Sequence, residues 1–118
     1  MLAVGEHVLG NLDPLMVKMT TGLAGGVGCT YQEMCGALSA GVLLVGALHG
    51  RSGSGEDDQP AFELAASYRQ RFAAEFGTTR CGPLREQVNA PGGLGSCSLV
   101  AERAARILLE LLAEQGRG

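Results

Sequence analysis

The 118-residue sequence contains no tryptophan, and aromatic residues make up only 4% of it. With so few large aromatic side chains, we expect the 19 glycines and many alanines to let helices pack closely against one another. Lysine and arginine form no cluster interleaved with aromatics, and the formal net charge is -3. These absences exclude the electrostatic surface that a nucleic-acid-binding protein needs.

Long hydrophobic runs are also absent. The longest nearly uninterrupted apolar stretch covers residues 34–48, which is shorter than the roughly 20 residues that a membrane-spanning helix needs. The N-terminal sequence lacks the basic region that opens a secretory signal peptide. We therefore expect a soluble cytoplasmic protein without membrane insertion. In that compartment cysteines are more often catalytic or metal-binding than permanently paired.

Helical patterns cover most of the chain, and no stretch sustains the period-two alternation of a strand. Asp13 and Pro14 mark one helix start, and glycines mark several helix ends. We expect helical segments over residues 2–12, from 14 to about 22, over 30–49, 59–76 and 83–88, and from 96 onward. The sequence therefore predicts an all-α fold, a single cysteine-containing domain over residues 1–118, built as a compact bundle of about five helices with glycine-rich loops.

The two longest of these helices have clear apolar faces. In the helix over 59–76, the side chains expected in the core are Phe62, Leu64, Ala65, Tyr68, Phe72 and Phe76. In the last helix they are Leu99, Val100, Ala104, Ile107, Leu108 and Leu111. The charged residues between them are expected to face water.

The four cysteines are the candidates for chemistry. Cys29, Cys81 and Cys97 each stand at the predicted start of a helix. Unpaired backbone N–H groups and the helix dipole favour negative charge at such a position, so a thiol there is expected to ionise more readily. The thiolate is the form that attacks disulfides and binds metals.

Cys35 is the exception among the four. Thr30 and Glu33 have the spacing of a capping box, which would begin the helix at Thr30 and place Cys35 in its second turn. Residues 36, 37, 40 and 41 are glycine or alanine. These small residues would leave space beside the Cys35 sulfur for a cofactor, another helix or a second sulfur.

The cysteine spacing leaves three interpretations open. There is no CxxC pair, and the gaps of 6, 46 and 16 residues match no standard zinc motif. The sulfurs could exchange between thiol and disulfide, or hold an iron–sulfur cluster or another metal. The third interpretation is a non-catalytic helical module in which the cysteines only pack, and a homodimer would then cover part of the apolar helix over 34–48.

The order of several motifs resembles the C_GCAxxG_C_C family of small helical redox-active proteins from bacteria and archaea. The glycine-rich LAGGVG precedes Cys35-Gly36-Ala37, whose helix ends in GALHGR, and FGTTRC and a helix beginning at Cys97 follow. The resemblance matches Cys35, Cys81 and Cys97 to three of the family's cysteines. The fourth lies in the first helix, where this sequence has none, and Ala40 replaces the final glycine of the CGAxxG motif.

This resemblance implies redox or electron-transfer activity, with an iron–sulfur cluster or another metal as a cofactor the cysteines could hold. We therefore expect Cys35, Cys81 and Cys97 to meet at one catalytic site, with Cys29 nearby. If the site binds a metal instead, Cys29, Cys35, Cys81 and Cys97 are the expected ligands. The redox partner is not indicated by any residue of the sequence.

Overall fold

The computed structural model describes residues 2–117. In this part of the chain the elements follow in the order α1 (Leu2–Leu9), α2 (Pro14–Thr20), the 3-10 turn η1 (Thr21–Leu23), α3 (Gly36–His49), α4 (Gln59–Phe76), α5 (Cys81–Asn89) and α6 (Cys97–Arg117). These residues form no strand, which confirms the all-α prediction. None of the described helices is both long enough and apolar enough to cross a membrane.

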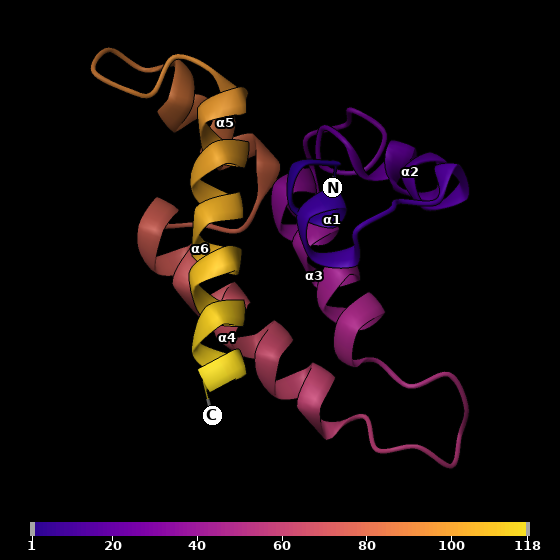
Figure 1. Cartoon of the computed structure of the whole chain (residues 1–118). Coiled ribbons are helices and arrows are strands. Elements are labelled where there is room, and N and C mark those ends of the chain that lie inside the picture. Colours follow the sequence, from indigo (N-terminus) through magenta and orange to yellow (C-terminus); the bar gives the residue numbers. More distant parts are fainter. Residues whose placement is uncertain (1, 118) are drawn as a thin grey trace.

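The core lies between α3, α4 and α6, which all contact one another. In Figure 1, α3 and α6 both run downward from their first turns, and α4 crosses behind α6. The buried side chains of these three helices are Leu38, Leu44, Val45, Leu64, Tyr68, Phe72, Phe76, Val100, Ala104, Leu108 and Leu111. The packing therefore brings the first turns of α3 and α6 to the same end of the bundle.

Two side chains predicted in the core are exposed. Phe62 is 61% exposed and Leu99 is 40% exposed. The buried residues of α4 recur every four positions from Leu64, and Phe62 precedes Leu64 by two residues, which turns it to nearly the opposite side of the helix. Leu99 is one residue before the buried Val100 and is rotated away by about 100°.

Tyr68 of α4 joins α3 to α6. Its ring is almost fully buried, and its hydroxyl lies 3.4 Å from the carbonyl oxygens of both Ala37 and Ala104, to which it can donate. Burial, and to a smaller extent the neighbouring Cys35, raises the pKa of Tyr68 well above its usual range, so the hydroxyl stays a donor. Gly41 leaves room for the ring, because a Cβ there would overlap it. These contacts fix the first turn of α3 against α6.

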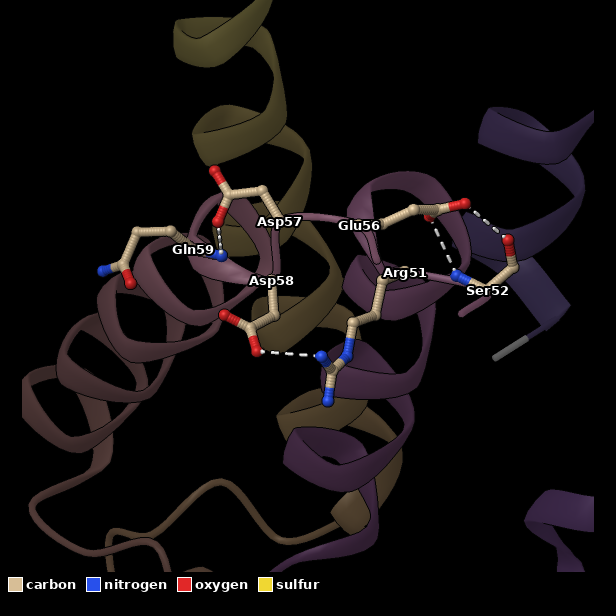
Figure 2. A network of polar contacts seen from close by, with 6 residues as sticks. All are labelled: Arg51, Ser52, Glu56, Asp57, Asp58 and Gln59. Atoms are coloured by element: carbon tan, nitrogen blue, oxygen red, sulfur yellow. Dashed lines mark hydrogen bonds and ion pairs between the residues drawn. The ribbon is translucent and has the colours of Figure 1, made fainter. Parts of the chain in front are cut away.

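The polar segment between α3 and α4 is a loop, as its composition predicts. Figure 2 shows its contacts, which include an ion pair of 3.6 Å between Arg51 and Asp58 and a hydrogen bond of 2.9 Å between the Ser52 hydroxyl and the Glu56 carboxylate. The backbone N–H of Gln59 donates to the Asp57 carboxylate at 3.0 Å, which satisfies a free amide at the start of α4.

Counted from N-cap to N-cap, α3 begins five residues later than the capping-box pattern predicts. Its N-cap is Cys35, and the preceding segment has φ angles of 59° to 64° at Gly25, Gly26, Val27, Gly28, Cys29 and Tyr31. A chain in this left-handed region cannot continue a right-handed helix. The Thr30 hydroxyl donates to the carbonyl groups of Gly26 and Val27 at 3.1 and 3.0 Å. The predicted capping box of Thr30 and Glu33 is therefore wrong.

Candidate functional site

All four cysteines line one cavity of about 500 Å³. We call this cavity the cysteine pocket. Its other lining residues are Thr20, Leu23, Ala24, Gly25, Tyr31, Gly36, Ala37, Ala40, Leu84, Arg85, Val100 and Ala101. It lies where the first turns of α3, α5 and α6 meet residues 25–31, which we call the left-handed segment because most of them have positive φ angles. Of the small residues expected to leave space beside Cys35, Gly36, Ala37 and Ala40 line the pocket, whereas the ring of Tyr68 fills the space beside Gly41.

Three cysteines stand at helix starts. Cys81 and Cys97 are there as predicted, but the third is Cys35 and not Cys29. Cys35 is the N-cap of α3, and Cys81 and Cys97 are the first residues of α5 and α6. Cys29 lies instead in the left-handed segment, with φ of 59°. The expected positions of Cys29 and Cys35 were thus both wrong, for the single reason that α3 begins at Gly36.

A short antiparallel bridge holds Cys35 next to Cys81. Met34 pairs with Arg80, and the two cysteines follow these residues in the chain. The backbone N–H of Cys35 donates to the backbone carbonyl oxygen of Thr79, and that of Cys81 donates to the backbone carbonyl oxygen of Glu33, both at 2.8 Å.

In such a bridge the two residues that follow the paired ones lie on the same face, at diagonal positions with Cα atoms about 7–8 Å apart. A disulfide needs about 4.4–6.8 Å between Cα atoms, so the two segments must move closer together before Cys35 and Cys81 can be joined. Both line the cysteine pocket. The bridge thus brings the backbones of Cys35 and Cys81 close together at one pocket, although 46 positions separate the two residues in the sequence.

The four thiols differ in exposure and charge. Cys81 is buried, Cys35 is half-buried, and Cys29 and Cys97 are exposed. Burial raises the pKa of Cys35, although the backbone N–H groups of Ala37 and Leu38 partly offset it.

Burial also raises the pKa of Cys81, and the neighbouring Cys35 raises it further, while Arg85 lowers it. For Cys35 and Cys81, the effect of burial exceeds that of the helix start. The expectation that a helix start makes the thiol ionise readily is therefore wrong for Cys81. Burial likewise determines the direction of the pKa shift of Cys35.

The donor set does not fit a metal ion in this arrangement. Within residues 2–117, no three His, Cys, Asp or Glu side chains lie close enough to hold one ion together. All four cysteines are free thiols. Cys29, Cys35, Cys81 and Cys97 as metal ligands stay a prediction, and we derive no step through a metal.

Comparison with known families finds a match over most of the chain. A family model described as "Putative redox-active protein (C_GCAxxG_C_C)" matches residues 1–111. The chain belongs to the C_GCAxxG_C_C family. The resemblance expected from its motif order is confirmed. Among curated proteins and among solved structures, the comparison finds no match.

Sequence patterns did not point to three residues that shape the site of this C_GCAxxG_C_C protein. Gly26 is buried, and a Cβ there would overlap Cys81. The guanidinium of Arg85 lies 4.1 Å from the centre of the Tyr31 ring, and both side chains line the cysteine pocket. One available signal was the position of Arg85 four residues after Cys81, which places both on one face of a helix.

The raised pKa of Cys35 and Cys81 predicts how their reactivity depends on pH. A free cysteine has a pKa of about 8.5, so its reaction with iodoacetamide levels off above that pH, because only the thiolate reacts. The alkylation rates of Cys35 and Cys81, followed by quantitative mass spectrometry, are expected to keep rising at higher pH. Rates that level off at or below about pH 8.5 would contradict this.

The raised pKa values of Cys35 and Cys81 also determine how the stability of the protein changes with pH. Unfolding returns both thiols to an ordinary pKa, so the unfolded protein loses these protons at a lower pH than the folded protein does. The two thiols therefore make their full contribution to the free energy of unfolding below about pH 8.5. This contribution is lost as the pH rises through their raised pKa values in the folded protein.

Proposed function

We propose that this C_GCAxxG_C_C protein exchanges electrons by thiol–disulfide chemistry and that Cys35 and Cys81 are its working pair. The observation that carries the proposal is the antiparallel bridge, whose two backbone hydrogen bonds of 2.8 Å hold the segments of Cys35 and Cys81 together where both residues line one pocket. These backbone hydrogen bonds do not depend on the oxidation state of the sulfurs. It therefore supports repeated cycling between dithiol and disulfide.

The different exposures of the two thiols support different roles. Cys35 is half-buried, and its sulfur lies near the backbone N–H groups of Ala37 and Leu38, which stabilise the thiolate. Cys35 attacks one sulfur of an incoming disulfide, forms a mixed disulfide and releases one thiol. Cys81, which is buried behind it, then attacks the Cys35 sulfur and releases the second thiol. The protein loses two electrons and two protons, and the incoming disulfide gains them.

The two alternative functions fit the site less well. A metal centre would need at least three of the sulfurs to move toward a common point, because the described cysteines are not grouped for a metal. A packing role would suit Cys81, but it gives no reason for Cys29 and Cys97 to be exposed. A homodimer and a redox partner both stay predictions.

Counting thiols tests the proposal. The reduced protein has four thiols, and one equivalent of a small neutral disulfide such as bis(2-hydroxyethyl) disulfide is expected to remove two of them. Dithiothreitol should restore both, and mass spectrometry should find no adduct on the oxidised protein. An adduct that accumulates without loss of a second thiol would overturn the proposal.

A further inference from the structure

The cysteine pocket has a single charged side chain among its lining residues in the described part of the chain. This is Arg85, which lies near Cys81 and lowers its pKa. No carboxylate within residues 2–117 forms an ion pair with it. The guanidinium of Arg85 lies over the face of the Tyr31 ring, 4.1 Å from its centre, which orients the group and leaves its N–H groups free to donate.

The remaining wall of the pocket is largely apolar. Leucine, alanine and valine side chains line it, and no acidic side chain does. A cavity of about 500 Å³ is within the range that holds small molecules rather than macromolecular segments. In such surroundings a hydrogen bond between a guanidinium and an anion is stronger than on an open surface.

We propose that the substrates of this site are small disulfides that carry a carboxylate, which Arg85 binds while the disulfide bond meets Cys35. This inference rests on the proposed function and adds the substrate class to it. Arg85 is one helical turn after Cys81, so an anion bound by its guanidinium lies beside the working pair. The first turns of α3, α5 and α6 point the positive ends of their dipoles at the same cavity, which adds to the preference for an anion.

The chemistry needs no further reactant. The carboxylate-bearing disulfide is the oxidant, and its S–S bond breaks when Cys35 attacks. One carboxylate-bearing thiol leaves in that step, and the second leaves when Cys81 closes the protein disulfide. Two electrons and two protons pass from the protein dithiol to the two released thiols.

The net charge of the protein does not explain this selectivity. At -3, the protein as a whole repels an anion at long range, so a preference for carboxylate must come from a local contact. This makes a charge-matched control available. Arg69 is an exposed arginine of α4 that does not line the pocket, and its loss changes the net charge as much as the loss of Arg85 does.

Oxidation rates with two probes test the proposal in the full chain. The reduced protein is mixed with 3,3′-dithiodipropionate, a dianion, or with the neutral bis(2-hydroxyethyl) disulfide, and the rate ratio of the two is measured. R85Q is expected to lower this ratio about tenfold, while R69Q leaves it unchanged. The ratio is insensitive to any change in thiolate fraction, because both probes meet the same thiols, and the circular dichroism spectrum of R85Q checks that the variant is folded.

The outcomes separate this inference from the function on which it rests. If neither probe oxidises the unmodified protein, the proposed function fails. If both probes oxidise it and R85Q has the same ratio as the unmodified protein, the substrate class is wrong and the function stands. An equal fall of the ratio in R69Q and R85Q would assign the preference to overall charge and would also overturn the inference.

Discussion

Replacing Cys81 with serine is expected to stop the reaction halfway. Cys35 would still attack the incoming disulfide, but no second thiol would resolve the product, so a mixed disulfide accumulates on Cys35. Intact-mass spectrometry after one equivalent of bis(2-hydroxyethyl) disulfide should show one adduct on Cys81→Ser and none on the unmodified protein. Replacing Cys35 with serine should remove both the adduct at position 35 and the disulfide to Cys81, because the buried Cys81 cannot meet the incoming disulfide in its place.

Matched variants at the two exposed cysteines control for this result. Cys29→Ser and Cys97→Ser should each still lose two thiols on oxidation, since neither residue takes part in the bridge. Cys81→Ala should behave like Cys81→Ser, which separates the loss of the thiol from the burial of a hydroxyl group. If Cys97→Ser is the variant that traps the mixed disulfide, the assignment of Cys81 as the resolving thiol is wrong.

The second large effect is expected at Gly26, where a methyl group should lower the free energy of unfolding by about 2 to 5 kcal/mol. Gly26 has φ of 61°, a conformation that costs an alanine about 1–2 kcal/mol. A Cβ there would also overlap the Cβ of Cys81 and approach the Glu33 carbonyl oxygen to 3.0 Å, and overpacking of this kind costs about 1–3 kcal/mol. Denaturant unfolding followed by circular dichroism measures the loss in Gly26→Ala.

Gly28 separates the backbone effect from the overlap. It has the same φ of 61°, but no atom outside its chain neighbours lies within 4 Å of a Cβ built there. Gly28→Ala should therefore lose only the backbone contribution of about 1–2 kcal/mol and keep the normal rate of oxidation. Gly26→Ala should oxidise more slowly, because the overlap displaces Cys81 from Cys35. Equal stability and equal rates in the two variants would show that Gly26 does not position Cys81.

The long helices could be predicted from local pattern. The stripe of Leu64, Tyr68, Phe72 and Phe76 repeats every four residues, and this period marks a buried helical face without knowledge of the neighbours. The start of α3 could not be predicted in the same way. The capping-box pattern there is overridden by the glycine-rich segment before α3, whose left-handed turn depends on backbone hydrogen bonds that reach across up to seven residues.

The pairing within the site depends on contacts between distant parts of the chain. The bridge between Met34 and Arg80 joins two segments whose sequences contain no strand signal, so no period in either segment reveals it. The pKa shifts of the thiols could not be predicted from the sequence for a related reason. A helix start is a local feature, but the burial that raises the pKa of Cys35 and Cys81 comes from the packed fold.

The most direct test is to identify which cysteines the oxidised protein joins. Trypsin cleaves after Lys18, Arg51, Arg80, Arg85 and Arg103, so Cys29 and Cys35 share one peptide, while Cys81 and Cys97 lie in two others. The Cys29→Ser variant removes the ambiguity, and its oxidised form is digested without reduction. The account predicts a disulfide between peptides 19–51 and 81–85. A disulfide from peptide 86–103 to either of the others would contradict it.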